Sequence, residues 1–452
     1  MNQAMNVNIG FISLGCAKNQ VDLEKLAGTL EGRTFNFTDK LSECDVVIVN
    51  TCGFIAPAVS EAVDAILDAR AKMPKRAKLI AFGCMMERYK GEISKELPEI
   101  DFVAGVGSTA QSQILEYLHK LYPDETNVKQ ADIKHTRYLL NSPYYAYLKI
   151  SEGCDNHCTY CTIPLIHGGQ RSVPANELVA QTAELVANGT KEIIVVGQDT
   201  SKYGSDMQDG TNLAILLGIL AKNFPQTYFR IMYINPDGVT DELIKAIKAY
   251  KNILHYFDIP IQHATDRILK KMARRSDSTQ IKGVFKLIRK LLPDSVIRTT
   301  LIVGFPTETD DDIDILKNFL EEYKPDYAGF FPYSPEEGTV AEHIAGRIDD
   351  KTIKMRLKAL QSVQKKITME RLKQFKVGEI TCFIERASDD FSFILEGRTL
   401  FQAPDVDGKM FVIDSAAIGE MDGAIRIGSP YRAKIQKIAY PDVYVKIIGA
   451  MN

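Results

Sequence analysis

Residues 144–164 read YYAYLKISEGCDNHCTYCTIP, an apolar run through Ile150 followed by three cysteines in a CxxxCxxC spacing. The apolar run has the composition of a buried β-strand, so Cys154, Cys158 and Cys161 lie on the loop that leaves this strand. In barrels of alternating strands and helices, such loops form the catalytic face. The stretch therefore predicts a three-cysteine site, which we name the barrel trio, at the carboxyl end of a barrel strand.

Five more strand signals, separated by helical patterns, follow this stretch: EIIVVG, YFRIMYI, YFDIPIQ, IRTTLIVGF and YAGFFPYS. Six strands that alternate with helices predict an α/β fold with a partial (βα)6 barrel over residues 136–349. Within it, the basic segment RILKKMARR at 267–275 is interpreted as the solvated face of a helix, and contact with an anionic partner is the alternative.

The first 125 residues also alternate strands with helices. The runs NIGFISLG, DVVIVNT and KLIAFG predict a parallel-sheet α/β domain over residues 1–125. Cys16, Cys52 and Cys84 each stand just beyond one of these strands, at the sheet edge where ligands bind. We therefore expect them to form a second site, the N-terminal trio. Burial for packing alone is the alternative, and it is the preferred interpretation for Cys44 and Cys382, which lack such placement.

Each trio has the ligands for an iron–sulfur cluster. Three thiolates can hold three irons of a 4Fe-4S cluster and leave the fourth iron free for a substrate or cofactor. For the barrel trio, a zinc site with His157 as the fourth ligand competes with this interpretation. Structural zinc usually pairs a C-x-x-C with a second, distant pair, and none is visible nearby. The sequence therefore favours clusters over zinc.

The last hundred residues change in pattern twice. Residues 350–376 contain no Gly or Pro and many cations, which predicts a charged connecting helix that packs one stripe on the barrel. Residues 377–452 contain short strands broken by Gly and Asp, which predicts a small antiparallel β-barrel.

Composition excludes several classes of protein. The 452 residues are 45% hydrophobic and 25% charged, which is typical of a chain with several folded domains and not of a disordered one. The net charge of −3 gives no global basic field that could collect RNA. The N-terminus lacks a basic segment with a long apolar run, and no stretch is long enough to span a bilayer. We expect a cytoplasmic protein without a membrane partner, in which cysteines serve metals or catalysis rather than disulfides.

The CxxxCxxC spacing with an aromatic at Tyr160 resembles the radical S-adenosylmethionine superfamily. The N-terminal trio, the barrel and the small terminal barrel together resemble its methylthiotransferase family, whose terminal module is called TRAM. The segments SLGCAKNQVDLE, NTCGFI, GQDTSKYG, DIPIQHA, IVGFPTET and YSPEEGT are similar to the RimO type, which acts on a ribosomal protein. The tRNA-modifying MiaB type usually differs around the first two cysteines.

The resemblance implies two 4Fe-4S clusters, one on each trio, and S-adenosylmethionine as the other cofactor. It implies that Tyr160 lies near the adenine of S-adenosylmethionine. It also implies that three further residues lie near this cofactor on barrel strand ends, namely Gln198, Arg298 and Gly304. The loop after the barrel trio departs from the family, which often has Arg-Gly and then Arg-Ser-Arg there. This chain has His167-Gly168 and Arg171-Ser172-Val173 instead.

The implied reaction is methylthiolation of the β-carbon of an aspartate in small-subunit ribosomal protein twelve. The barrel cluster would convert one S-adenosylmethionine into a 5'-deoxyadenosyl radical that removes hydrogen from the substrate, and the N-terminal cluster would carry the sulfur. A reductant protein such as flavodoxin or ferredoxin is a second expected partner. Two alternatives remain, a tRNA adenosine methylthiotransferase of the MiaB type and a non-catalytic iron-sulfur binding protein, although electron carriers normally saturate their irons with four cysteines.

The charge of the terminal module bears on the choice of substrate. Residues 379–452 contain eight basic and eleven acidic side chains, a net charge of −3. This balance is unfavourable for a surface that neutralises tRNA phosphates and favourable for one that meets a cationic ribosomal protein. The sequence therefore predicts the protein substrate, with tRNA as an unlikely partner.

Overall fold

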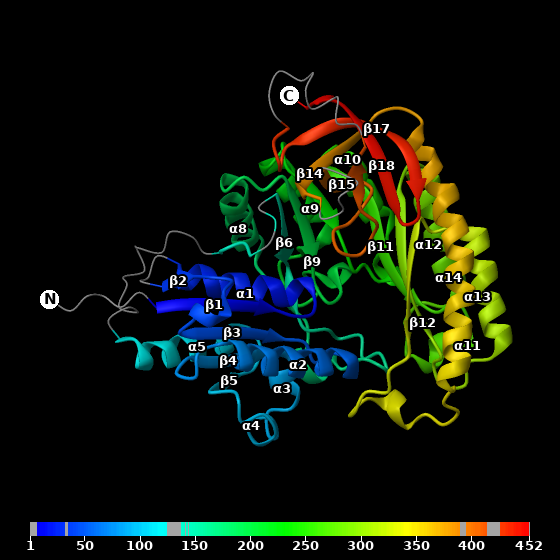
Figure 1. Cartoon of the computed structure of the whole chain (residues 1–452). Helices are drawn as coiled ribbons and strands as arrows, with labels where there is room; N and C mark the ends of the chain where they lie inside the picture. Colours follow the sequence, from blue (N-terminus) through cyan, green and yellow to red (C-terminus); the bar gives the residue numbers. More distant parts are fainter. Residues whose placement is uncertain are drawn as a thin grey trace.

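The computed structural model describes residues 7–31, 35–123, 137–140, 142, 144–388, 395–413 and 425–451. It has the α/β fold expected from the sequence, with two parallel sheets and a small closed β-barrel. Figure 1 shows the N-terminal sheet (blue) and the closed barrel (orange to red) against different parts of the larger sheet with its helices (green to yellow). Residues 124–136, which connect the first two sheets along the chain, lie outside the described residues.

The N-terminal sheet has five parallel strands in the order β2-β1-β3-β4-β5. Helices α1 and α5 pack on one face of this sheet and α2 and α3 on the other. The sheet contains two strands that the sequence pattern did not indicate, β2 and β5, because runs of three residues show no periodicity. The strands are β1 (Val7–Ser13), β2 (Phe35–Phe37), β3 (Val46–Thr51), β4 (Lys78–Gly83) and β5 (Phe102–Ala104), and the helices are α1 (Ala17–Leu30), α2 (Ala56–Lys72), α3 (Cys84–Arg88), α4 (Ile93–Glu96) and α5 (Gly107–Leu121).

The central sheet has six parallel strands in chain order, which is the open barrel expected from the sequence. The strands are β6 (Tyr145–Lys149), β9 (Glu192–Val196), β10 (Tyr228–Ile231), β11 (Ile253–Gln262), β12 (Val296–Val303) and β13 (Tyr327–Pro332). Its helices are α7 (Ile163–His167), α8 (Ala175–Ala187), α9 (Leu213–Asn223), α10 (Asp241–Ala249), α11 (Asp266–Lys271), α12 (Ser278–Leu291) and α13 (Asp310–Tyr323). The two-residue strands β7 (Ser151–Glu152) and β8 (Arg171–Ser172) pair antiparallel beside the barrel trio.

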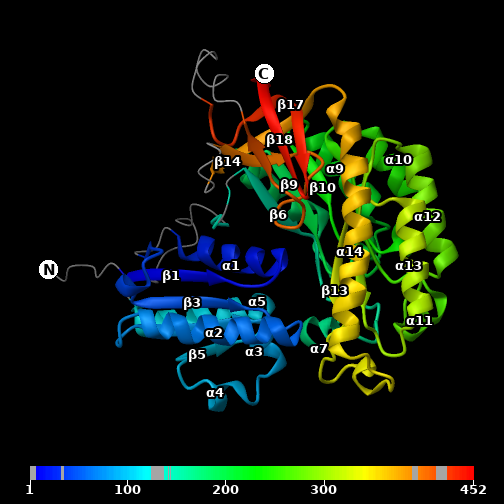
Figure 2. The same cartoon turned by 45° about the vertical axis from the view of Figure 1, so that its right-hand side comes forward.

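The connecting helix α14 (Asp350–Leu372) packs along α13 and β13 (Figure 2). Its buried stripe is partly polar. Arg356 is bonded to Glu308 at 2.8 Å, and Gln364 and Thr368 donate hydrogen bonds to the carbonyl oxygens of Pro325 and Asp326. Because these groups satisfy one another away from water, the helix is fixed to the barrel along this stripe.

The terminal barrel closes in the order β14-β15-β16-β18-β17. Four of its strand pairs are antiparallel, but β16 and β18 pair parallel. The strands are β14 (Ile380–Ala387), β15 (Leu395–Thr399), β16 (Met410–Val412), β17 (Pro430–Ala439) and β18 (Asp442–Ala450); residues 389–394 and 414–424 of this region lie outside the described part.

The terminal barrel shares a core with the inner face of the central sheet. Alternate residues of β6 divide between two sets of neighbours, because successive side chains of a strand point to opposite faces. Ala146 and Leu148 pack toward the helices, whereas Tyr145 and Tyr147 pack in one cluster with terminal-barrel residues such as Met410. The terminal barrel is therefore part of the same folded body as the central sheet.

Candidate functional site

The N-terminal trio lies at the carboxyl edge of the first sheet, as the sequence predicted. Cys16 precedes the first turn of α1, Cys52 follows β3 directly, and Cys84 is the first residue of α3. The buried side chain of Asn19 links two of them, since its Oδ1 accepts from the Cys16 sulfur at 3.7 Å and from the Cys84 sulfur at 3.5 Å. Its Nδ2 donates to the carbonyl oxygen of Thr51, the residue before Cys52. Asn19 therefore holds the three cysteine-bearing loops together.

Two glycines allow these loops to approach one another. Gly15 has a φ of +90°, and a Cβ built there would lie 2.7 Å from the Cβ and 3.1 Å from the sulfur of Cys52. At Gly53, a Cβ would lie 2.5 Å from the Cα of Met85, the residue after Cys84. Any side chain at these positions would separate the cysteines, because backbone at such distances cannot move aside cheaply.

The environment of the N-terminal trio favours the protonated form of two of its thiols, those of Cys52 and Cys84. Burial raises the pKa of Cys52, and burial together with neighbouring Cys16 and Cys52 raises the pKa of Cys84 strongly. A metal centre that binds thiolates removes this cost, since its positive charge replaces the protons. The donor set and its burial thus fit a cluster held by three cysteines.

The barrel trio lies on the loop after β6, and polar donors face its sulfurs. Asn156 Nδ2 donates to the Cys154 sulfur at 3.3 Å and to Asp199 Oδ2 at 2.7 Å. Arg274 Nη1 donates to the Cys158 sulfur at 3.6 Å. Donors aimed at sulfur stabilise bound thiolates and tune the metal. Arg274 belongs to the basic segment 267–275, so the interpretation of that segment as only a solvated face was wrong for this residue.

Neither trio has the geometry of a single-ion site. In the described part of the chain, no three Cys, His, Asp or Glu side chains converge closely enough to hold one metal ion. All ligands of a zinc ion must reach the same centre at about 2.0–2.3 Å. In a 4Fe-4S cluster, each thiolate binds a different iron, so the sulfurs stay further apart. His157, the ligand of the zinc alternative, is exposed. The donor set of each trio, three thiols, is the one that a three-cysteine 4Fe-4S cluster uses.

Two contacts join the loops that carry the trios. His167, at the end of α7, brings its Nε2 to 3.3 Å from the Cys84 sulfur and its Nδ1 to 2.9 Å from Glu152 Oε1. Thr162, next to the last barrel cysteine, donates a hydrogen bond of 3.1 Å to the carbonyl oxygen of Phe54, two residues beyond Cys52. The cysteine edges of the two sheets therefore face each other.

Charged side chains hold the two sheets in this arrangement. Arg88 after the N-terminal trio pairs with Glu336 after β13 at 2.8 Å, and both side chains are buried. Lys149 pairs with Asp22 of α1 and with Glu152. Burial alone would raise the pKa of the Glu152 carboxyl, but contacts with His167 and Lys149 lower it instead. The interface is thus ionic as well as apolar.

The residues expected to contact S-adenosylmethionine fall into two groups. Tyr160 and Gln198 lie beside the barrel trio: Tyr160 packs with Tyr333 over a small apolar cluster, and Gln198 donates to Glu152 Oε1 at 2.7 Å. The Oε1 of Gln198 is buried and has no hydrogen-bond partner among the described residues, which leaves an acceptor free for a ligand.

Arg298 and Gly304 have other contacts. Arg298 is the third residue of β12 rather than a strand-end residue, and it contacts Asp258 at 3.1 Å and Asp407 of the terminal barrel at 3.5 Å. Gly304 does follow the end of β12, but a Cβ there would point at Ile353 of α14, at 2.5 Å from its Cδ1. Their expected contacts with S-adenosylmethionine stay predictions.

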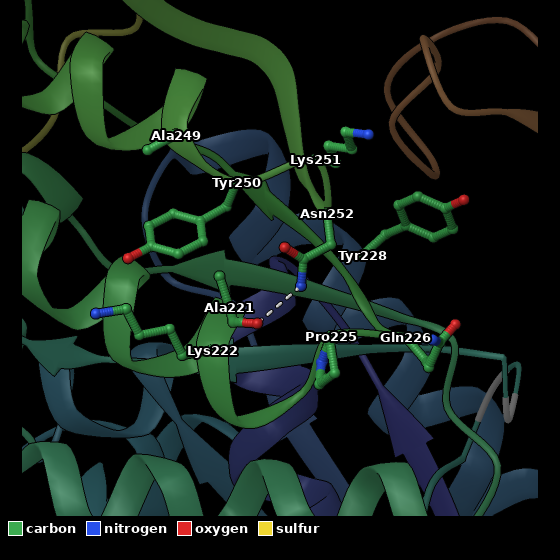
Figure 3. A pocket seen from close by; sticks show the side chains of 9 residues that line it. All are labelled: Ala221, Lys222, Pro225, Gln226, Tyr228, Ala249, Tyr250, Lys251 and Asn252. Atoms are coloured by element: carbon green, nitrogen blue, oxygen red, sulfur yellow. Dashed lines mark hydrogen bonds between the residues drawn. The ribbon is translucent and has the colours of Figure 1, made fainter.

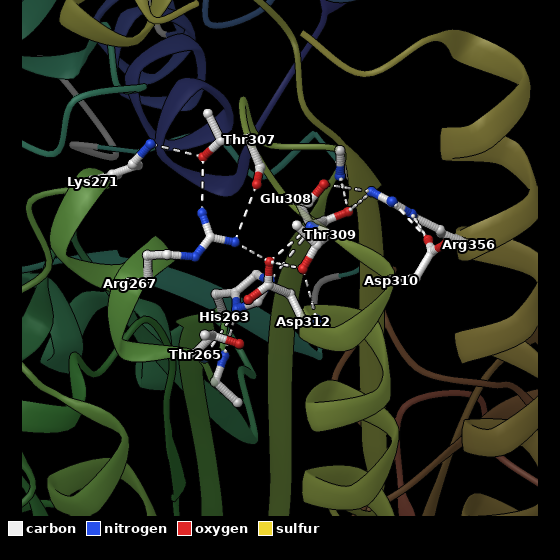
Figure 4. A network of polar contacts seen from close by, with 12 residues as sticks. His263, Thr265, Arg267, Lys271, Thr307, Glu308, Thr309, Asp310, Asp312 and Arg356 are labelled. Carbon is white, nitrogen blue, oxygen red and sulfur yellow. Dashed lines mark hydrogen bonds and ion pairs between the residues drawn. The ribbon is translucent and has the colours of Figure 1, made fainter. Parts of the chain in front are cut away.

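A polar network supports the segment after β12 (Figure 4). Glu308 Oε1 accepts from the amide of Gly304 at 3.0 Å and from Arg356 at 2.8 Å. Fully buried His263 accepts two backbone amides through Nδ1 and faces Glu308 with its Nε2 at 3.5 Å. Glu308, Arg356 and His263 carry no local sequence signal of this network, because the three residues are distant from one another along the chain.

One further pocket lies apart from the site. It is bordered by Lys222, Tyr228, Tyr250, Lys251 and Asn252 (Figure 3). These residues stand at the amino ends of β10 and β11, the opposite end of the strands from the barrel trio. This pocket therefore does not belong to the cysteine site.

Comparison with known proteins now identifies the chain. The pattern of the Radical SAM superfamily matches residues 148–320, and that of the uncharacterized protein family UPF0004 matches residues 8–105. The ribosomal protein uS12 methylthiotransferase RimO of Alkaliphilus oremlandii is 40% identical over 411 residues, covering 90% of this chain and 93% of the relative. The RimO proteins of Trichlorobacter lovleyi and Aquifex aeolicus are each 39% identical and cover 93% and 97% of this chain and 96% of themselves. The chain belongs to the RimO methylthiotransferase family.

Membership in the RimO family makes the chain a radical S-adenosylmethionine methylthiotransferase, an enzyme class that uses S-adenosylmethionine and a 4Fe-4S cluster. Its fold is similar to that of the radical S-adenosylmethionine methyltransferase TsrM from Kitasatospora setae, at a TM-score of 0.54 and 12% identity over 75% of this chain and 77% of TsrM. In the described part of the chain, every helix is too short or too polar to cross a membrane.

The two cysteines outside the trios are buried, as predicted. Cys44 packs in the core of the first sheet, and Cys382 packs in the terminal barrel. Burial raises the pKa of Cys382 to about 12, and burial with the carboxylates of Asp45, Glu43 and Asp39 raises that of Cys44 to about 11. Both thiols are therefore structural.

We expect these two thiols to resist alkylation by iodoacetamide at pH 8 in the native enzyme. The thiolate is the reacting species, and the raised pKa values leave roughly 100-fold less of it at Cys44 and roughly 1,000-fold less at Cys382 than in an unperturbed thiol. Peptide mass spectrometry after timed labelling measures this directly, with guanidinium-unfolded protein as the control in which both cysteines react. Labelling should increase as the pH rises toward 11. Rapid native labelling at pH 8 would contradict the packing role.

Proposed function

We propose that the chain methylthiolates the β-carbon of an aspartate in small-subunit ribosomal protein uS12 and uses two 4Fe-4S clusters, one on each trio. The observation that carries this proposal is the direct contact between the two cysteine edges through His167 and Thr162. Addition of a methylthio group to an unactivated carbon needs a radical source and a sulfur source next to the same substrate atom. Two facing cysteine sites meet that requirement. The names of the RimO relatives support uS12 as the substrate.

In this proposal, the chain divides its tasks among four segments. Residues 1–125 hold the sulfur-carrying cluster and residues 136–349 hold the radical-generating one. Residues 350–376 brace the barrel, and residues 377–452 form the TRAM module that meets the substrate protein. The reaction would take place in the cytoplasm, with flavodoxin or ferredoxin as the electron donor.

The side chains around each trio have definite roles in this scheme. Bound clusters and S-adenosylmethionine would supply the radical and the sulfur. Asn156 and Arg274 stabilise the barrel thiolates by donating hydrogen bonds to sulfur, and Asn19 positions the N-terminal trio by donating to the carbonyl oxygen of Thr51 beside Cys52. Tyr160 is proposed to pack on the adenine, and the free amide oxygen of Gln198 is proposed to accept a hydrogen bond from S-adenosylmethionine.

The test is anaerobic turnover by the reconstituted full-length enzyme with S-adenosylmethionine and a reductant, in parallel reactions with uS12 and with bulk tRNA. Mass spectrometry of both products should find one methylthio group on a single aspartate of uS12. Unmodified tRNA is the expected result of the second reaction. Methylthio-adenosine in tRNA together with unmodified uS12 would contradict the proposal and establish the MiaB-type alternative.

A further inference from the structure

Lys18 differs from Lys149, the other lysine between the trios, because it forms no direct ion pair with a carboxylate. Lys18 lies two residues after Cys16, in the first turn of α1, and it is half-buried. Nearby Lys149 pairs with Asp22 and Glu152, and Arg274 donates to Cys158 and Asn235. Across the described residues, Lys18 forms no ion pair.

Lys18 stands at a position where a cation is unfavourable for the stability of helix α1. The amino end of a helix carries partial positive charge, so acidic side chains are favoured in the first turn and cations are not. Helix α1 has no acidic residue in its first turn to offset Lys18, and its cap makes no side-chain hydrogen bond. Burial lowers the pKa of Lys18, but negative charge at Cys16, Tyr233 and Glu152 outweighs this and raises the pKa. Because no carboxylate contacts it directly, this ammonium group can bind one from outside the chain.

The other contact of Lys18 comes from the barrel. Its Nζ lies 4.4 Å from the centre of the Tyr233 ring. Tyr233 follows β10 with a φ of +61°, a strained conformation for a residue other than glycine. Its amide donates to Asp258 at 3.0 Å, and its carbonyl oxygen accepts from the amide of Thr200 at 3.0 Å. Both backbone groups are thus fixed, and the ring is preorganised beneath the ammonium group.

We propose that Lys18 binds the side-chain carboxylate of the aspartate that is modified. This inference rests on the proposed function and adds the group that recognises the substrate. When the carboxylate of the aspartate binds Lys18, the β-carbon is one bond away from the bound carboxylate group. The β-carbon then lies next to Cys16 of the N-terminal trio and next to the barrel surface that carries Tyr233. Lys18 thereby discriminates an acidic side chain from its neutral analogues, because a buried cation without its anion is costly.

The experiment compares Lys18→Met and Lys18→Arg with the wild type and with Lys72→Ala, a control at an exposed lysine of α2 that pairs with Asp68. The substrates are uS12 and uS12 in which the target aspartate is replaced by asparagine. For Lys18→Met, kcat/KM with uS12 should fall roughly 10- to 150-fold, which corresponds to the loss of one charge-assisted hydrogen bond. Lys18→Arg should recover part of this loss, and Lys72→Ala should match the wild type.

Two readouts separate binding from other roles. Iron content and 5'-deoxyadenosine formation without substrate should be unchanged in Lys18→Met, because Lys18 serves the substrate and not the clusters. The wild type should strongly favour uS12 with aspartate over uS12 with asparagine, whereas Lys18→Met should lose most of that preference. The difference between the two preferences is the coupling energy that a double-mutant cycle measures. A variant that keeps full discrimination, or that loses iron, would overturn the inference. Failure of the wild type to modify uS12 at all would instead overturn the proposed function, and the inference with it.

Discussion

Replacement of Cys16, Cys52 and Cys84 by alanine together should abolish the methylthio product while 5'-deoxyadenosine still forms. The barrel trio alone would generate the radical, whereas sulfur delivery would need the N-terminal trio. Iron should fall from about eight to about four per chain, since one of two 4Fe-4S clusters is lost. Iron analysis, 5'-deoxyadenosine quantification and mass spectrometry of uS12 measure the three quantities on one preparation.

The matched control replaces Cys154, Cys158 and Cys161 by alanine. It should also retain about four irons, but it should form neither 5'-deoxyadenosine nor product. A second control, Cys44→Ser with Cys382→Ser, removes two thiols that lie outside both sites and should keep about eight irons. Full methylthiolation by the variant without the N-terminal trio would refute the sulfur-carrier role. Unchanged iron in either trio variant would refute the two-cluster assignment.

The cysteine trios could be predicted from the sequence because each depends on local signals. An apolar run shows a buried strand, and a cysteine after such a run lies at the ligand edge of a parallel sheet. The structure has these strands at β1, β3, β4 and β6. The same reasoning finds the open barrel, since six strand patterns in alternation with helices allow few topologies.

The long-range contacts of the trios could not be predicted this way. His167 reaches Cys84 across 83 positions of sequence, and Arg274 reaches Cys158 across 116. Neither residue has a periodic pattern, because its role is set by how distant segments of the chain come together and not by its own secondary structure. At His167 the sequence departs from the family pattern after the barrel trio. That departure was the one local signal of a special contact there.

The charge count of the terminal module shows a second limit of prediction from sequence. Composition treats all its charged residues as surface, but Arg398 and Asp407 are buried and paired with the central sheet. Burial of Asp407 raises the pKa of its carboxyl even though Arg298 opposes the shift. Glu396 is buried as well, so one basic and two acidic residues among those described leave the surface, and the excess of acids over bases in the module falls from three to two.

Arg398→Ala should be among the most destabilising single substitutions in the chain. The guanidinium of Arg398 on β15 contacts Glu192 Oε2 of β9 at 2.7 Å and Glu385 Oε1 of β14 at 2.7 Å. Glu192 is completely buried and shares its charge with Arg230 at 2.7 Å. Removal of Arg398 leaves buried carboxylates short of positive charge, and the loss of one partner of a buried pair costs about 3–5 kcal/mol.

The control for this prediction is Arg432→Ala in the same terminal barrel. Arg432 pairs with Glu379 at 3.2 Å, but both side chains are about half exposed, so its loss should cost no more than about 1 kcal/mol. Urea denaturation measures the difference in unfolding midpoint, and hydrogen exchange identifies where protection is lost. Because Arg398 joins β15 to β9, exchange should increase at the inner face of the central sheet as well as in the terminal barrel. Equal effects of the two substitutions, or exchange confined to the terminal barrel, would mean that this barrel is not anchored through the Arg398–Glu192 pair.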